Sequence, residues 1–256
     1  MRVIAVTGSA SGIGAAVRRA LTEAGDRVIG VDLRDAEVEA DLSHAAGRER
    51  AVAGVERACG STLDGVVVCA GLGPQVPDPA AIVSVNYFGA AVLLDALRPV
   101  LARSARRAAV AVASNSAALV ASAPNPLADA CLRGDEPQAR SLAAQGDGFG
   151  AYAGSKLALA RFVRRRAVSA EWAGAGIRLN AVAPGAVRTP LLDAGLAHEQ
   201  LGPAIRAFPI PLGGFGEAAQ IASAIAFLLS DAASFCCGSV LFVDGGSDAL
   251  ARPGSF

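Results

Sequence analysis

The chain has 256 residues and a mass of 25.5 kDa, which is the size of a single α/β domain with a large core. Its charges balance at pH 7 and its pI is near 6.7, which argues against nucleic acid or an anionic membrane surface as a partner. Hydrophobic residues make up 53%, yet no uninterrupted apolar run reaches the roughly 18 residues of a membrane span, so we expect no membrane partner.

The first half of the chain alternates strands and helices. It begins directly with an apolar strand, so we expect no signal peptide and a cytoplasmic location. Near-continuous valines in 65–69 are typical of a strand covered on both faces, as in a parallel sheet. Strands are predicted over 2–7, 27–32, 38–41 and 65–69, and helices over 12–24, 43–59 and 80–101.

The second half continues this alternation, apart from one long interruption at 116–148. This insertion contains three prolines and two short predicted helices, and long loops of this kind usually have a function or cover an interface. No linker divides the chain, so the order predicts one domain over 1–256, a doubly wound parallel sheet with helices on both faces. The remaining strands are predicted over 108–113, 177–182 and 239–243, and helices over 127–132, 138–144, 152–173 and 217–229.

A glycine-rich segment at 7–14 joins the first strand to the first helix and reads T-G-x-x-x-G-x-G. Its glycines allow a tight turn and a close approach to a pyrophosphate, whose charge the N-terminus of the helix stabilises. Alone, such a segment is often only a turn, but here it has the strand–turn–helix context of a nucleotide-binding motif. The predicted cofactor contacts are Gly8, Ser11, Gly12, Ile13 and Gly14.

Asp32 ends the second predicted strand, where a carboxylate accepts both hydroxyls of an adenosine ribose and repels a 2′-phosphate. The alternative is an aspartate that only closes the strand. Arg34 lies close enough to suggest NADP, but the glycine-rich segment contains no basic residue, so we predict NAD. Further predicted contacts are Asp41 and Leu42 beside the adenine and, unless they are only a strand exit, Ala70 and Gly71 beside a ribose.

Tyr152 and Lys156 lie four residues apart and therefore share one face of a predicted helix. Lys156 is the only lysine among 23 basic residues, and the chain has two tyrosines, so chance is a poor explanation for this pair. An ammonium group is a compact charge that can lower the pKa of a phenol and still reach a ribose hydroxyl. Both residues are predicted in catalysis and in cofactor binding.

Two further polar residues stand at positions where chemistry is expected. Asn86 lies within an apolar helix, where a buried asparagine either holds a water or kinks the helix, and an exposed asparagine is the alternative. Ser114 follows the strand 108–113, where a serine is more often a turn residue than a catalytic one. Ser114 and Ser116 point to the same side of an extended chain.

The segment 184–189 leaves the strand 177–182 at its carboxyl end, where ligands bind in this architecture. Its predicted cofactor contacts are Pro184, Gly185, Val187 and Thr189. Thr189 donates to an amide or a phosphate, or caps a helix that begins at Pro190, and the two roles are compatible. The apolar stretch 190–211 that follows either lines a pocket for an apolar substrate or belongs to the core.

The cysteines and histidines form no metal-binding pattern, so we expect no metal. The number of cysteines is odd and no C-x-x-C occurs, which is typical of reduced thiols. His44 and His198 are far apart in the sequence and are predicted at the surface. The five cysteines are Cys59, Cys69, Cys131, Cys236 and Cys237.

Taken together and in their order along the chain, these motifs resemble those of the short-chain dehydrogenase/reductase family, and the resemblance covers the whole chain. Cys69 departs from the family pattern, which usually has asparagine there, and the insertion lengthens the usual gap between Ser114 and Tyr152. Within the family, the segments on the cofactor side are most similar to bacterial 3α-hydroxysteroid dehydrogenase/carbonyl reductases. Coniferyl-alcohol dehydrogenases are similar at the same places.

The resemblance implies a Rossmann-type fold and an NAD(H)-dependent oxidoreductase that interconverts a secondary alcohol and a ketone, or an alcohol and an aldehyde, on an apolar substrate such as a 3α-hydroxysteroid. Tyr152 would be the acid and base, and Lys156 would lower its pKa and bind the nicotinamide ribose. Ser114 would bind the substrate oxygen, and Asn86 would hold a water that links Lys156 to solvent. The alternatives are a dehydrogenase for coniferyl-type or other small alcohols, and a non-catalytic NAD(H) sensor or scaffold.

The resemblance also implies an oligomer. In the family, the helix that carries Asn86 and the helix that carries Tyr152 commonly pair across a subunit contact. An insertion just before Tyr152 would cover that surface. We therefore expect a homodimer, rather than a tetramer, formed through 217–229 and the last strand.

Overall fold

A computed structural model, which describes residues 1–254, contains one seven-stranded sheet in which all neighbouring strands are parallel. The strand order is β3-β2-β1-β4-β5-β6-β9, so the direction of winding reverses between β1 and β4. This is the predicted doubly wound sheet. The strands are β1 (Val3–Thr7), β2 (Arg27–Asp32), β3 (Val38–Glu39), β4 (Gly65–Val68), β5 (Ala108–Val112), β6 (Arg178–Pro184) and β9 (Val240–Val243).

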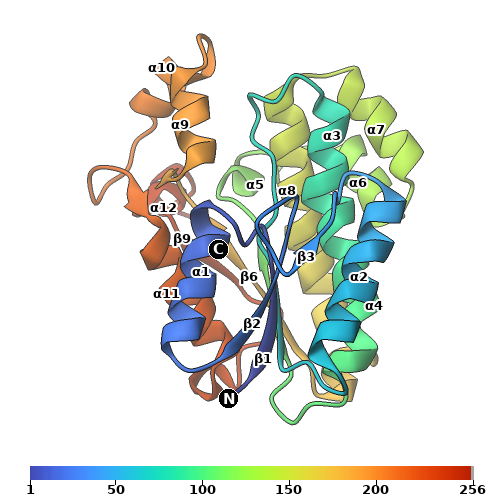
Figure 1. Ribbon diagram of the computed structural model, residues 1–256. Helices are drawn as coiled ribbons and strands as arrows, with labels where there is room; N and C mark the ends of the chain where they lie inside the picture. Colours follow the sequence, from blue (N-terminus) through green and yellow to red (C-terminus); the bar gives the residue numbers. More distant parts are fainter. Residues whose placement is uncertain (255–256) are drawn as a thin grey trace.

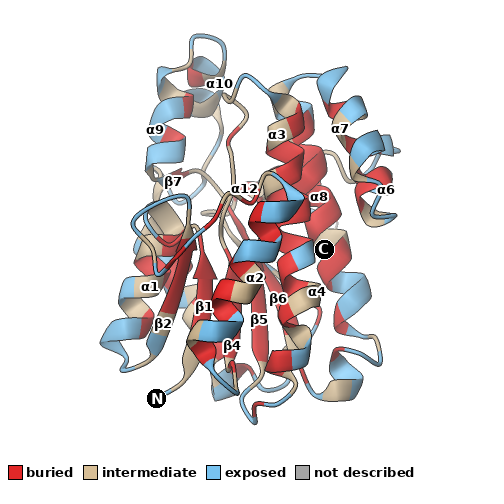
Figure 2. Cartoon of the chain, turned by 45° about the vertical axis from the view of Figure 1, so that its right-hand side comes forward, coloured by how far each residue is buried: buried red, intermediate tan, exposed pale blue. Residues whose placement is uncertain are grey.

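Helices cover both faces of the sheet, with a hydrophobic core on each side (Figure 1). On one face lie α1 (Gly12–Glu23) and α11 (Ala218–Leu229), which contact each other. On the other face lie α2 (Ala45–Cys59), α4 (Ala90–Leu101) and α8 (Gly148–Ala167). The central strands are buried along most of their length because helices cover both of their faces (Figure 2).

The long predicted helix at 80–101 is interrupted. It consists of α3 (Pro79–Val83), a π-helical segment η1 (Ser84–Gly89) and α4. By length and composition Pro79–Leu101 could cross a membrane, but 72% of its apolar window is buried inside the protein, as in the core helix of a soluble protein. Asn86 lies within the π-helical segment, a local widening that often occurs at functional sites.

The insertion folds into three short helices, of which α6 (Pro126–Leu132) and α7 (Glu136–Ala144) match the predicted ones and α5 (Ser116–Leu119) was not predicted. Both α6 and α7 contact α8, and α7 also contacts α3. The prediction of a helix over 152–173 is wrong at both ends. Asp147 caps α8 by accepting a hydrogen bond from the Gly150 backbone at 2.6 Å, and after Ala167 the chain turns and buries Trp172 completely.

Two helices, α9 (Pro190–Ala197) and α10 (Leu201–Ala207), stand above the carboxyl edge of the sheet, at the top of Figure 1. They occupy the apolar stretch that the sequence assigned either to a pocket or to the core. The remaining short elements are β7 (Val187–Arg188), β8 (Gly216–Glu217), which pairs with β7, the 3-10 helices η2 (Ala173–Ala175) and η3 (Asp231–Ala233), and α12 (Ser247–Ala251).

Candidate active site

A cavity of about 440 Å³ opens at the carboxyl edge of the sheet, beside the point where the winding reverses. It extends from the glycine-rich turn past the ends of β2, β4, β5 and β6 to α9 and α10. Of the predicted site residues, only Asn86 does not line it. The others are Gly8, Ser11, Gly12, Ile13, Gly14, Asp32, Asp41, Leu42, Ala70, Gly71, Ser114, Tyr152, Lys156, Pro184, Gly185, Val187 and Thr189.

The glycine-rich turn is built for close packing of backbone against backbone. Gly8 has a φ of 68° and donates its N–H to the Val31 carbonyl at 2.8 Å. A Cβ on Gly14 would overlap the Gly8 carbonyl oxygen, so only glycine fits there. Ser11, at the N-cap of α1, makes no side-chain cap, which leaves the first N–H groups of the helix for an anion. The turn therefore fits a pyrophosphate.

Asp32 lies at the end of the cavity where the sequence predicted the adenosine. Its side chain accepts hydrogen bonds from the Ala10 and Leu33 backbones at 2.9 Å and 2.7 Å, which hold it against the glycine-rich turn. Among the described residues that line the cavity, Lys156 is the only basic one, and Arg34 does not line it. This charge pattern fits a ribose with two free hydroxyls better than one with a 2′-phosphate.

Ser114 and Tyr152 meet inside the cavity. Ser114 follows β5, and α8 brings the Tyr152 side chain against it from the other side of the cavity. Burial raises the pKa of Tyr152, and a hydrogen bond with the Ser114 side chain acts in the opposite direction. Ser114 Oγ also accepts a hydrogen bond from Ser116 Oγ at 3.0 Å, so the two serines do lie on the same side of the chain.

Lys156 is almost completely buried, with 4% of its surface exposed, and its Nζ donates to the Val112 carbonyl at 2.7 Å. Burial lowers its pKa from 10.5 to about 8, opposed by the nearby Cys69. Burial holds the pKa of Tyr152 above its usual value in the protein alone, and the expectation that Lys156 and the nicotinamide ring lower it stays a prediction. Desolvation of the phenol is the stronger effect.

Asn86 lies behind the cavity wall and is fully buried, which excludes the exposed alternative. Its side-chain amide donates to the Leu72 carbonyl at 3.0 Å and accepts from the Leu72 backbone at 2.7 Å. It also donates to Ser155 Oγ at 3.4 Å. The side chain therefore fixes the loop after β4, whose Gly71 faces Asn86 and Lys156.

Thr189 caps α9, which confirms one of the two roles considered from the sequence, and its donation to an amide or a phosphate stays a prediction. Its Oγ1 accepts a hydrogen bond from the Leu192 backbone at 3.2 Å and so caps α9, while the residue lines the cavity close to Gly12. The helix cap thus places the start of α9 beside the glycine-rich turn. In this way α9 becomes one wall of the cavity.

The sequence analysis missed part of the apolar end of the cavity. Leu119, in the insertion, and Phe149, in the first turn of α8, are both 43% exposed and line the cavity. Large hydrophobic residues near the start of the insertion and directly after its end are the sequence signal that could have found them. The other apolar residues at this end are Pro74, Leu191, Leu192, Leu201, Ala204, Ile205 and Phe208.

Cys69 lines the cavity beside Lys156, and burial raises the pKa of its thiol to about 12. It is therefore a neutral neighbour of the ammonium group. Within residues 1–254, no three His, Cys, Asp or Glu side chains lie together in a way that could hold a metal ion. His44 is exposed and caps α2, and His198 is partly exposed and accepts weakly from the following backbone at 3.3 Å.

Comparisons with known proteins agree with this geometry. A family model described as enoyl-(acyl carrier protein) reductase matches residues 8–248. A 3-alpha-hydroxysteroid dehydrogenase/carbonyl reductase of Comamonas testosteroni is 49% identical over 100% of both chains. A cis-4-hydroxycyclohexanecarboxylate dehydrogenase of Sinomonas cyclohexanicum is 34% identical over 97% of each. The solved structure of a 3-alpha-hydroxysteroid dehydrogenase of Pseudomonas sp. B-0831, complexed with NADH, has a TM-score of 0.96 and 52% identity, and the match covers 99% of this chain and 100% of that one.

Proposed function

The chain belongs to the short-chain dehydrogenase/reductase family, and from this membership we propose that it oxidises 3α-hydroxysteroids with NAD and reduces the corresponding 3-ketosteroids with NADH. The resemblance found in the ordered motifs is confirmed, and the protein is an oxidoreductase of alcohol and carbonyl groups. The observation that carries the proposal is the meeting of Ser114, Tyr152 and Lys156 in one cavity with the glycine-rich turn.

The cavity favours a large apolar substrate with a single reacting oxygen. Its outer end is lined by apolar side chains of α9, α10 and the insertion, whereas Ser114 and Tyr152 present hydroxyl groups in its interior. A steroid nucleus is apolar, and its 3-oxygen would be the group that meets these hydroxyls. The relatives named for 3-alpha-hydroxysteroids support this choice of substrate.

NAD, when bound, supplies the acceptor for the hydride, and the protein's own residues handle the proton. We assign the proton to Tyr152 Oη: as the phenol it gives its proton to the carbonyl oxygen during reduction, and as the phenolate, which Lys156 and the nicotinamide ring would stabilise, it takes the proton of the alcohol during oxidation. Ser114 is fixed by Ser116 and donates a hydrogen bond to the same oxygen as its negative charge grows. Lys156, with a pKa near 8, carries a positive charge in this cavity at neutral pH.

We further propose that NAD is preferred to NADP. The support is the Asp32 carboxylate, which is held at the adenosine end by two backbone N–H groups, together with the absence of an arginine among the described lining residues. A 2′-phosphate at this place would meet a negative charge without a basic partner.

The test measures turnover by the purified protein from the change in absorbance of the reduced nucleotide. The substrates are androsterone, coniferyl alcohol and simple cyclic alcohols, each with NAD and with NADP. Reduction of NAD by the steroid supports the proposal. Activity only on coniferyl alcohol or small alcohols refutes the steroid substrate but still supports NAD-dependent oxidation of an alcohol. NADH binding without any turnover would favour a non-catalytic sensor or scaffold.

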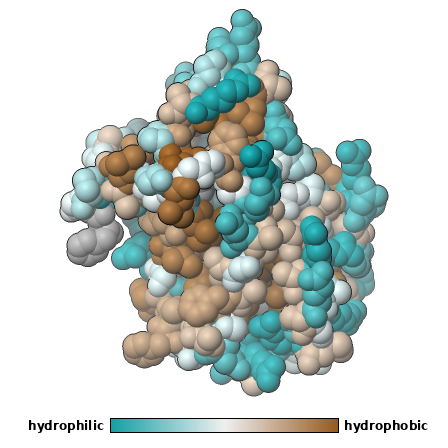
Figure 3. Space-filling view, turned by 90° about the vertical axis from the view of Figure 1, so that its left-hand side faces the viewer, coloured by the Kyte–Doolittle hydropathy of each residue, from teal (hydrophilic) through white to brown (hydrophobic). Residues whose placement is uncertain are grey.

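We also propose that the protein is a cytoplasmic homodimer that pairs through α11 and β9. β9 is an edge strand, and large hydrophobic residues are exposed around it: Phe227, Phe235, Leu241 and Leu250. Figure 3 faces this side of the molecule and shows extended hydrophobic surface on it. The five unpaired cysteines fit a reducing compartment. Light scattering that gives the mass of four chains would contradict the dimer.

A further inference from the structure

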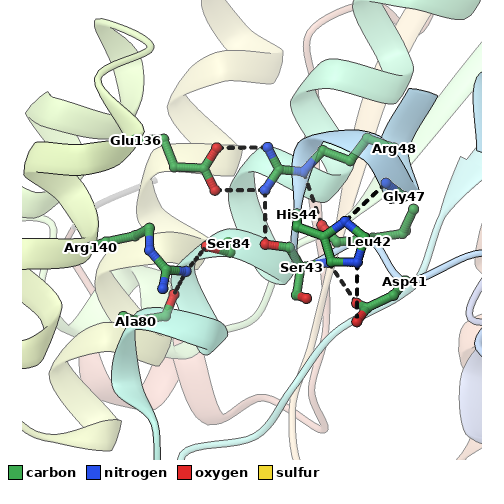
Figure 4. A network of polar contacts seen from close by, with 10 residues as sticks. All are labelled: Asp41, Leu42, Ser43, His44, Gly47, Arg48, Ala80, Ser84, Glu136 and Arg140. Atoms are coloured by element: carbon green, nitrogen blue, oxygen red, sulfur yellow. Dashed lines mark hydrogen bonds and ion pairs between the residues drawn. The ribbon is translucent and has the colours of Figure 1, made fainter. Parts of the chain in front are cut away.

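The third helix of the insertion, α7, is attached to the body of the protein by an ion pair in which Arg48 is buried and Glu136 is partly buried. Glu136, its first residue, accepts two hydrogen bonds from the Arg48 guanidinium, at 2.6 Å and 2.7 Å. Arg48 is 3% exposed and lies in the first turns of α2, far from Glu136 in the sequence. Figure 4 shows the two side chains pointing directly toward each other. Such a two-pronged contact fixes direction as well as distance.

The same guanidinium holds the wall at the adenosine end of the cavity. Arg48 Nε donates to the Leu42 carbonyl at 2.9 Å, and Nη2 donates to the Ser43 carbonyl at 3.2 Å. Leu42 and its neighbour Asp41 line the cavity at the place where the sequence predicted the adenine. Glu136 therefore acts on this wall through a single intervening side chain.

A second contact ties α7 to the π-helical segment. Arg140, one turn after Glu136, donates to Ser84 Oγ at 2.6 Å and to the Ala80 carbonyl at 3.4 Å (Figure 4). The π-helical segment also packs closely on Leu42, because a Cβ on its Gly89 would lie 3.2 Å from the Leu42 Cβ. Leu42 is thus held between the π-helical segment and Arg48, and α7 contacts both of these supports.

The charge state of the pair favours a rigid contact. Burial acts to raise the pKa of Glu136, but the hydrogen bonds from Arg48 lower it below its usual range, so the carboxyl group is charged at neutral pH. Removal of the Glu136 carboxylate leaves the charge of the buried Arg48 without compensation, and the Arg48 side chain is then free to change its position. The insertion has a useful contrast in Asp129 of α6, which pairs with Arg161 at 3.8 Å and is half exposed.

We propose that Glu136 is a positioning residue for the adenosine half of NAD(H): through Arg48 it fixes the Leu42 and Ser43 carbonyls, and with them the wall against which the adenine binds. This inference rests on the proposed function, since it takes the cavity to be the NAD(H) site. It gives the insertion a role in cofactor affinity that lies far from the reacting atoms. The residues that touch the substrate are not involved.

The experiment compares Glu136→Gln and Glu136→Ala with Asp129→Asn, which weakens an ion pair of the same insertion away from residues 41–43. The dissociation constant of NADH, inhibition by ADP-ribose, and kcat at saturating NAD are measured for each. We expect Glu136→Gln to weaken NADH and ADP-ribose equally, by about 3-fold to 30-fold, the range that coupling through packed contacts usually reaches. Its kcat should stay within about twofold of the wild type, because the ground state and the transition state lose the same binding energy at the adenosine half.

Asp129→Asn should leave all three quantities unchanged. The inference is overturned if the Glu136 variants bind NADH as tightly as the wild type, if kcat falls while NADH affinity is kept, or if NADH weakens and ADP-ribose does not. Should Glu136→Ala fail to fold, the isosteric Glu136→Gln decides the matter. If the wild-type protein does not bind NADH, the proposed function itself is overturned. This outcome is recognised from the wild type alone and is therefore distinct from a failure of the inference about Glu136.

Discussion

The buried Lys156 makes a prediction about stability that can be separated from catalysis. The pKa of Lys156 is lowered from 10.5 to about 8, which means that the charged ammonium group destabilises the folded state. At ~1.36 kcal/mol per pKa unit, this cost is about 3 kcal/mol. This cost is fully present below pH 8 and disappears as the pH rises through 10.5, because the unfolded chain binds more protons in that window. Stability should therefore rise with pH through this residue.

The perturbation is Lys156→Met, which keeps the length of the side chain and removes the charge. The difference between the unfolding free energies of the two proteins should shift in favour of the wild type by about 2 to 3 kcal/mol between pH 7 and pH 10. The variant also leaves the Val112 carbonyl without its partner, but that cost does not depend on pH. Only the pH dependence of the difference is therefore interpreted.

Denaturant unfolding without nucleotide can be followed by the fluorescence of Trp172, the single and completely buried tryptophan. Both proteins are compared at one concentration, because association would change their apparent stability. A difference that stays constant from pH 7 to pH 10 would refute the reasoning, since it would mean that Lys156 titrates in the folded protein as it does in the unfolded chain.

Other substitutions test the remaining parts of the site. Tyr152→Phe should reduce kcat by roughly 10²-fold or more and keep NADH binding, because it removes only the proton donor; full turnover would exclude this role. Gly14→Ala should weaken NADH binding and lower the melting temperature, since its Cβ would overlap the Gly8 carbonyl oxygen, and unchanged binding would contradict that geometry. Asp32→Asn should narrow the preference for NAD over NADP, measured as the ratio of their kcat/KM values, by about 10-fold or more.

Much of the fold and of the site could be predicted from the sequence because their signals are local. Valine-rich strands and amphipathic helices follow from the spacing of apolar residues, and the glycine-rich turn follows from its place between a strand and a helix. Tyr152 and Lys156 could be paired from their spacing alone, since four residues make nearly one helical turn. The parallel order of the sheet then determines that these local motifs meet at one edge.

The ends of α8 and the course of the long helix could not be read in the same way. α8 starts four residues before Tyr152 because Asp147 caps it, and it ends at Ala167, five residues before the completely buried Trp172. Asn86 was correctly expected to be buried or to distort its helix, but its binding to Leu72 depends on a loop that is distant in sequence. The spacing of apolar residues along the chain gives no information about such contacts between distant residues.

By itself the sequence determined the class of fold, the glycine-rich turn between the first strand and the first helix, and the placing of Tyr152 and Lys156 on one helix face, because each depends on residues close together in the chain. The tertiary structure decided three other matters: the raised pKa of Tyr152, the lowered pKa of Lys156 and the pairing of Glu136 with Arg48. Each of these depends on burial, or on a neighbour that is remote in sequence. Desolvation and long-range contact exist only once the chain has folded, and they determine how the site works.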